Sequence, residues 1–132
     1  MTISQSVRDS VAARASNRCE YCRLHRLDDV SPQHIEHIRP RKHGGSDDPS
    51  NLALACFHCN RHKGSDLAGI DRETGKLISL SNPRAQTWSE HFLAKGVSIL
   101  GLTPTGRVTA TVLKINDGKR LELRATALHG ID

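Results

Sequence analysis

The chain has 132 residues, which is enough for one domain with an appendage and too few for two full domains. Its formal net charge of +5 fits a polyanionic partner such as nucleic acid, and its four aromatic residues leave a mainly aliphatic core that a metal crosslink would reinforce. No apolar run approaches the roughly 20 residues of a membrane span, and the polar first ten residues do not resemble a secretory signal. We therefore expect a cytoplasmic protein, in which disulfides are uncommon and cysteines are more often metal ligands.

The first half of the chain has the pattern of a helix followed by a strand–loop–strand–helix unit. A helix is expected over residues 4–18, where valines and alanines form one apolar stripe. Pro40 ends the first strand, and two adjacent glycines mark the loop that follows it. The elements expected after the first helix are a strand at His34–Ile38, a loop at Arg41–Asn51, a strand at Leu52–Ala55 and a short helix from Asn60 to about Leu67.

The second half gives a weaker pattern. We expect a helix over Gln86–Ala94, a strand over Val97–Leu102 and a helix over Gly106–Ile115 that Thr105 caps. Leu121–Leu128 fits either a helix or a strand. Residues 1–67 are interpreted as a core with a metal site, and residues 68–132 as an extension of unknown role that packs on it.

Two Cys-x-x-Cys pairs, Cys19/Cys22 and Cys56/Cys59, predict a structural zinc site. Two residues between paired thiols allow both sulfurs to reach one ion, and two such knuckles complete a tetrahedron. The alternatives are a redox-active pair or free thiols in the core. A thioredoxin-like redox motif needs a βαβ pattern around one pair, and the sequence has none.

Four short motifs follow one another between about Arg18 and Ser65. They are an acidic–histidine pair (Glu36-His37), a glycine loop (Gly44-Gly45), an Asn-Leu strand start (Asn51-Leu52) and a helix with the pattern Cys59-Asn60-x-x-Lys63-Gly64. Their order and spacing resemble the HNH endonuclease family. The resemblance implies a small α+β fold: a ββα-metal (His-Me finger) nuclease core with four-cysteine zinc knuckles, an N-terminal helix and a C-terminal extension.

The resemblance also implies roles for four residues. His37 would be the general base, Glu36 and Asn60 would hold one catalytic divalent ion, and Asn51 would orient His37. Hydrolysis of a phosphodiester needs an activated water and a cation that offsets charge on the phosphoryl oxygens. Carboxylate and amide oxygens favour Mg²⁺ or Mn²⁺, and a histidine accepts protons near neutral pH.

Each of these residues also has a purely structural interpretation. Glu36 and His37 would then be ordinary surface residues of a zinc ribbon, Asn51 would cap a turn, and Asn60 would begin the following helix. His34 and His62 are accessory candidates for metal or phosphate, and His34 equally fits a partly buried structural histidine. The expected nucleic-acid contacts, which would otherwise be a solvated basic face, are Arg39, Arg41, Lys42, Arg61 and Lys63.

The function expected from this resemblance is metal-dependent hydrolysis of phosphodiester bonds in DNA, most readily double-stranded, with 5′-phosphate and 3′-hydroxyl products. The alternative is a non-catalytic DNA-binding module with the same zinc-stabilised fold. An RNA-directed nuclease, or a subunit that needs a partner, is a third hypothesis. A pure binding module has no need of a base beside a metal-binding carboxylate, which favours the enzyme.

Overall fold

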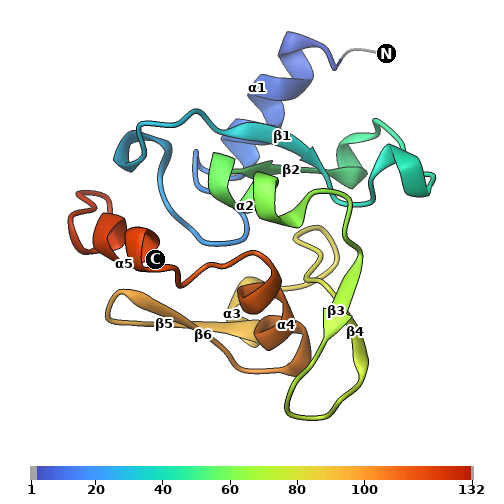
Figure 1. Cartoon of the computed structure of the whole chain (residues 1–132). Coiled ribbons are helices and arrows are strands. Elements are labelled where there is room, and N and C mark those ends of the chain that lie inside the picture. Colours follow the sequence, from blue (N-terminus) through green and yellow to red (C-terminus); the bar gives the residue numbers. More distant parts are fainter. Residues whose placement is uncertain (1–2, 132) are drawn as a thin grey trace.

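The computed structural model describes residues 3–131, which form a mixed α+β structure with three two-stranded antiparallel sheets (Figure 1). This architecture confirms the predicted fold class. The elements of the first half are α1 (Gln5–Arg14), β1 (His34–His37), β2 (Leu52–Ala55) and α2 (Phe57–Lys63), with 3₁₀ turns at Arg26–Asp28, Arg41–His43 and Pro49–Asn51. Those of the second half are β3 (Ala68–Ile70), β4 (Leu77–Ser79), α3 (Trp88–His91), β5 (Phe92–Lys95), β6 (Ser98–Gly101), α4 (Pro104–Val112) and α5 (Gly118–Ala125).

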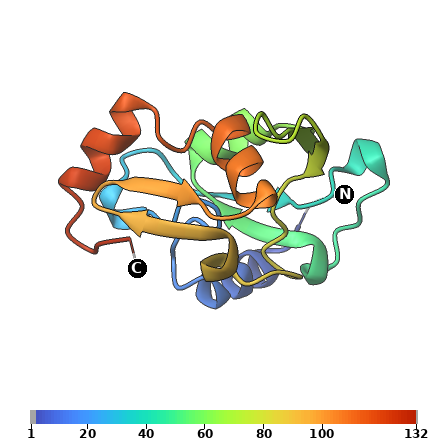
Figure 2. The same ribbon diagram turned by 90° about the horizontal axis from the view of Figure 1, so that it is seen from below.

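The β1–β2 hairpin lies between α1 and α2 (Figures 1 and 2). Side chains alternate across a strand, so Leu52 and Leu54 of β2 face α1, where they pack on Val11 and Ala15. Glu36 of β1 lies opposite Ala53 in the register. The small alanine side chains of β2 let α2 approach the other face of the hairpin.

The helix α2 begins earlier than the sequence pattern predicts. The side chain of Cys56 accepts the backbone N–H of Cys59 and caps the helix, which therefore starts at Phe57 rather than at Asn60. Gly64 follows the last helical residue with a φ of +50°, a conformation that favours glycine and ends the helix there. Lys63 is three and four residues after Asn60 and Cys59, so these side chains lie on neighbouring parts of one side of α2, which packs on the hairpin.

The second half consists of two hairpins covered by α4. The β3–β4 hairpin, which the sequence interpretation does not include, and β6 both pack against this helix. The close approach of α4 to the end of α3 depends on Gly106, because a Cβ at that position would lie 2.0 Å from the backbone oxygen of His91. Among residues 3–131, no helix is long and apolar enough to cross a membrane.

Two expectations for the second half are wrong in detail. The helix over Gln86–Ala94 stops at His91, because Gly96 turns the chain back at a φ of +60° and pairs β5 with β6. The cap of α4 is Thr103, whose side chain accepts the Gly106 N–H, and not Thr105. The open choice for the last segment resolves as a helix, α5.

One buried cluster joins the two halves of the chain. It places the four cysteines, Tyr21 and Leu24 in the same apolar core as Phe92, Ile99 and Leu113. Trp88 stacks on Phe92 at 5.2 Å between ring centroids, and its indole N–H donates to the backbone oxygen of Tyr21 at 2.8 Å. The second half therefore forms one wall of the cysteine-containing core.

Candidate functional site

The four cysteines predicted to bind zinc come together in the structure. Their sulfur atoms all lie within 4.8 Å of one another, and all four side chains are buried. In each pair the backbone N–H of the second cysteine points at the sulfur of the first, at 3.5 Å from Cys22 to Cys19 and at 3.3 Å from Cys59 to Cys56. Four buried thiols at one point, without a disulfide among them, are positioned to bind a metal ion and suit a closed structural zinc site.

The pKa values of the cysteine thiols also favour a bound cation. Burial raises the pKa of the Cys19 thiol well above its usual range. Hydrogen bonding with Cys19 lowers the pKa of Cys22 well below that range, whereas hydrogen bonding with Cys19 and Cys22 raises the pKa of Cys59. Among these three cysteines a thiolate is therefore favoured at Cys22, and a bound cation would lower the pKa of Cys19 and Cys59.

Arg120 brings positive charge to this cluster from α5. Its guanidinium donates to Cys56 Sγ at 3.4 Å and to Asp29 Oδ2 at 3.3 Å. Burial lowers the pKa of Arg120, but Cys56, Cys22 and Asp29 outweigh that effect and leave the pKa raised. Arg120 therefore remains charged and partly offsets the negative charge of ionised cysteines.

Three of the predicted site residues line one open pocket of about 250 Å³. Glu36 and His37 reach it from β1, and Asn60 reaches it from α2, with Arg41, Pro40, Ile35 and Gly64 completing the wall. The strand and the helix thus gather a carboxylate, an imidazole and an amide at one surface depression. Asn51 does not line this pocket.

Glu36 is buried and both its oxygens have partners inside the protein. The hydroxyl of Tyr21 donates to Oε2 at 2.6 Å, and the ammonium of Lys63 lies 2.5 Å from Oε1. Burial raises the pKa of Glu36, and the neighbouring Lys63 opposes that rise. Lys63 also donates to the backbone oxygens of His37 at 3.3 Å and Ile38 at 3.0 Å, which fastens the end of α2 to the end of β1.

His37 is held by a carboxylate that the sequence interpretation did not include. Its Nε2 atom lies 2.7 Å from Asp47 Oδ1, and the guanidinium of Arg41 contacts the same oxygen at 2.8 Å. Hydrogen bonds from His37 and Arg41 lower the pKa of Asp47, which stays ionised. With Asp47 ionised, Nε2 is the protonated nitrogen and donates, so the lone pair of the ring lies on Nδ1.

Asn51 braces the loop between the strands instead of touching the His37 ring. Its amide nitrogen donates to the backbone oxygens of Arg39 at 3.0 Å and Ser46 at 2.8 Å, and its Oδ1 accepts the Arg39 N–H at 2.8 Å. Gly45 makes this packing feasible, because a Cβ there would lie 1.6 Å from the Arg39 oxygen. Asn51 therefore influences His37 only indirectly, by holding the backbone at Arg39, two residues after His37.

Of the remaining predicted residues, Arg41 lines the pocket and the others do not. His34 packs its ring 5.8 Å from that of Phe57, and His62 lies beside His58 on α2. Lys63 was expected at the nucleic-acid surface, and this expectation is wrong because its side chain is buried against Glu36. The other basic residues expected to contact nucleic acid are exposed, namely Arg39, Arg41, Lys42 and Arg61.

The missed residues gave only weak signals in the sequence. Asp47 stands in the glycine loop ten residues after His37, and Tyr21 lies inside the first Cys-x-x-Cys pair. Neither spacing indicates a side-chain contact, because both contacts depend on how the loops return to β1. Lys63 belongs to the recognised helix motif, but a lysine near a proposed DNA surface suggests a phosphate contact before a buried ion pair.

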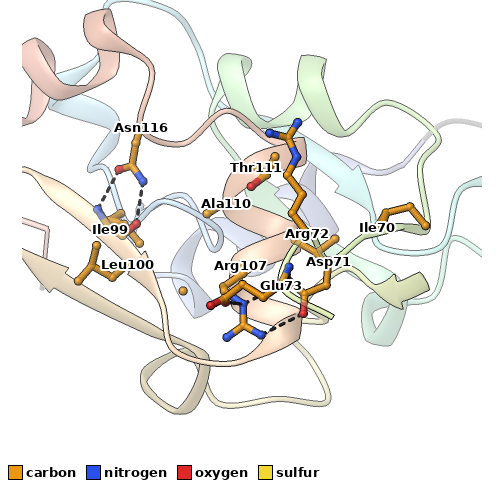
Figure 3. Close-up of a pocket in the computed structure, with 12 residues that line it drawn as sticks. Ile70, Asp71, Arg72, Glu73, Ile99, Leu100, Arg107, Ala110, Thr111 and Asn116 are labelled. Carbon is orange, nitrogen blue, oxygen red and sulfur yellow. Dashed lines mark hydrogen bonds and ion pairs between the residues drawn. The ribbon is translucent and has the colours of Figure 1, made fainter. Parts of the chain in front are cut away.

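A second cavity of about 300 Å³ lies in the other half of the chain, between the β3–β4 turn, β6 and α4 (Figure 3). Several of its polar side chains are engaged with the protein itself: Arg107 pairs with Asp71, and Asn116 pairs with the backbone of Ile99 (Figure 3). No cysteine or histidine lines it. These contacts hold neighbouring elements together, so the pocket at Glu36 is the stronger candidate for a functional site.

Comparison with known families gives one match. Residues 19–66 match the family model described as HNH endonuclease. No curated protein and no solved structure matches the chain. The matched segment includes both cysteine pairs and the three pocket residues Glu36, His37 and Asn60. Residues 19–66 of this chain are therefore similar to the HNH endonuclease family, as the sequence motifs predict.

Proposed function

We propose that this protein is a metal-dependent endonuclease that hydrolyses phosphodiester bonds in DNA at the pocket lined by Glu36, His37 and Asn60. The observation that carries the proposal is the convergence of these three side chains, from a strand and a helix, on one open depression. A closed structural site would have no such opening. The family match supports nuclease or DNA-binding function for this segment.

The donor set of the pocket fits a hard divalent cation. Glu36 and Asn60 would hold the ion, which would be Mg²⁺ or Mn²⁺, since both ligands are oxygens. The carboxylate oxygens of Glu36 have two lone pairs each, so each oxygen keeps acceptor capacity beside its bond to Tyr21 or Lys63. When bound, such an ion offsets negative charge on the phosphoryl oxygens.

His37 is the proposed general base. With Nε2 hydrogen-bonded to Asp47, its Nδ1 lone pair accepts the proton of the attacking water. Asp47 then stabilises the imidazolium that results, and Arg41 holds Asp47 in place. Asn51 keeps the loop that carries Asp47 at a fixed distance from β1.

The exposed basic side chains near the pocket would contact the DNA backbone. Arg39, Lys42 and Arg61 are exposed, and the net charge of the chain is +5. Such contacts give affinity without reading the base sequence. The cysteine cluster, with zinc as its ion, would hold α2 and the first knuckle together beneath this surface.

One observation favours a second candidate, a DNA-binding module without catalysis. Tyr21 and Lys63 already neutralise and hydrogen-bond Glu36, and this arrangement joins β1 to α2 without any ion. In that case Glu36 would be purely structural. The two candidates predict different results when His37 is removed.

The test is single-turnover cleavage of plasmid DNA with Mg²⁺ or Mn²⁺ by the wild type and by His37→Ala. The enzyme hypothesis predicts unchanged DNA affinity and a cleavage rate lower by roughly 10²–10⁴-fold, the usual contribution of a general base. His43→Ala is the matched control, because His43 is an exposed histidine of the 3₁₀ turn after β1 and should leave the rate near that of the wild type. Equal cleavage by His37→Ala would refute the catalytic assignment, and DNA binding without cleavage by the wild type would support the binding module.

A further inference from the structure

Helix α2 carries two histidines on the side that faces away from the pocket. His58 and His62 are four residues apart, so they lie one turn from each other on the same face. Asn60 lies midway between them in the sequence, and at about 100° per residue it points to roughly the opposite side. The rings of His58 and His62 lie with their centroids 4.4 Å apart. This pair is therefore separate from the Glu36 pocket.

A carboxylate joins the two histidines from another part of the chain. The connection between α4 and α5 passes next to α2 (Figures 1 and 2), and Asp117 stands at its end. One ligand atom from each of His58, His62 and Asp117 lies within 4.8 Å of the other two. Two imidazoles and a carboxylate at this spacing can all reach one cation.

The side chain of Asp117 does not cap helix α5, although the residue stands at the capping position. Asp117 is the N-cap residue of α5, where an aspartate usually accepts a backbone N–H of the first turn. Here it makes no such side-chain bond, and its carboxylate lies toward the histidine pair instead. The capping role is therefore unfilled, which leaves the oxygens of Asp117 available to a ligand.

The hydrogen bond of the His58 ring also fixes its tautomer. Its Nε2 atom lies 2.8 Å from the backbone oxygen of Lys114, and because a carbonyl only accepts, Nε2 carries the proton. The lone pair of the ring is then on Nδ1. Metal-binding histidines generally donate their other ring N–H to a carbonyl or carboxylate in this way, which fixes the tautomer before the ion arrives.

We propose that His58, His62 and Asp117 form a second site for a divalent transition-metal ion, separate from both the cysteine cluster and the Glu36 pocket. Two imidazoles and one carboxylate suit Zn²⁺, Co²⁺, Ni²⁺ or Cu²⁺ better than Mg²⁺, which prefers oxygen ligands throughout. With three protein ligands and an exposed aspartate, the site leaves at least one coordination position to water or an anion.

The site would connect the HNH segment to the second half of the chain. His58 and His62 belong to residues 19–66, and Asp117 begins α5, which also carries Arg120 to the cysteine cluster. Occupancy would therefore hold α5 against α2. Lys114 and Arg61 lie near His62, and their positive charges weaken cation binding, so we expect this site to fill only after the four cysteines.

The test is metal binding to protein whose cysteine cluster already holds one zinc. Calorimetric titration with Zn²⁺, and absorption spectra with Co²⁺, should show one further equivalent in the wild type, with the spectrum of nitrogen and oxygen ligation and without thiolate charge transfer. Thermal unfolding should shift upward in excess Zn²⁺. These readouts do not depend on DNA cleavage.

Two variants locate the extra equivalent. Asp117→Asn and His62→Gln should each weaken its binding by at least tenfold and remove the thermal shift while retaining the first zinc, because neither residue belongs to the cysteine cluster. His43→Gln is the matched control and should bind the second equivalent as the wild type does. If the wild type binds no second equivalent, or if Asp117→Asn and His62→Gln bind it unchanged, the proposal is overturned.

Discussion

The cysteine cluster and the Glu36 pocket differ in burial and in the kinds of side chain that they bring together. The cluster gathers four like ligands, all buried, and the backbone N–H groups of its knuckles point at two of the sulfurs. The pocket gathers three unlike side chains at an opening, and its carboxylate is shared with Tyr21 and Lys63. A closed set of identical ligands serves stability, whereas an open and mixed set leaves space for a substrate and a water.

Of the changes that test this comparison, removal of one cysteine thiol should have the largest effect. Cys59→Ser should abolish stable folding at 25 °C, since structural zinc contributes roughly 10–16 kcal/mol in small zinc domains and a whole domain is stable by only about 5–15 kcal/mol. Circular dichroism on heating and elemental analysis for zinc measure the effect. A cooperative transition at the wild-type temperature, without bound zinc, would show that the cluster is not what holds the core.

Breaking the Glu36–Lys63 pair tests how far the pocket is structural. Lys63→Met leaves a buried carboxylate without its cation and should cost about 3–5 kcal/mol of unfolding free energy. The double variant Glu36→Gln/Lys63→Met should recover much of that loss, because no buried charge remains. Lys95→Met, at an exposed lysine of β5, is the control and should change little. Urea denaturation of the wild type, Glu36→Gln, Lys63→Met, the double variant and the control measures the coupling, and additive effects of the two single changes would contradict the pairing.

The contact between Asp47 and His37 separates catalysis from stability. Asp47→Asn keeps the shape of the side chain but removes the charge that stabilises an imidazolium, so cleavage should fall on the order of 10–100-fold. The Asp47 side chain is 25% exposed in its loop, and the melting temperature should stay near that of the wild type. Rates measured across pH with Mg²⁺ or Mn²⁺ present give the comparison. An unchanged rate would mean that Asp47 does not orient the base.

The smallest effect is expected at the basic surface. Replacement of Lys42 and Arg61 by alanine should reduce the slope of log affinity against log salt by about 0.9 for each lost phosphate contact. Fluorescence anisotropy with a labelled duplex at several salt concentrations measures the slope. The buried Lys63 is expected to make no such contact. An unchanged slope in the double variant would place the DNA on another face.

Local patterns in the sequence predicted the parts of the site that depend on short spacing. The two Cys-x-x-Cys pairs, the Glu36-His37 pair and the strand–loop–strand–helix order all follow from neighbours along the chain. Contacts between distant loops did not follow. Asp47 reaches His37 only because the glycine loop folds back against β1, and Lys63 reaches Glu36 only because α2 ends at Gly64.

The same limit explains the errors in the second half. The stretch from Trp88 to Ala94 has helical spacing of its aromatic residues, yet the turn at Gly96 makes Phe92 the first residue of a hairpin strand. The β3–β4 hairpin has strands of three residues each, too short for an alternating pattern to be recognised. In both segments the pairing of two strands determined the secondary structure.

The shared core has a consequence for synthesis and folding. Tyr21 and Leu24 pack with Phe92, Ile99 and Leu113, which leave the ribosome some seventy residues or more later. Arg18 likewise donates to the backbone oxygens of His129 and Gly130 near the opposite end of the described chain. Native contacts over such sequence separations form late and slow the rate-limiting step of folding. We therefore expect residues 19–66 to remain an incomplete and aggregation-prone intermediate, with apolar side chains exposed, until the residues up to Gly130 have been made.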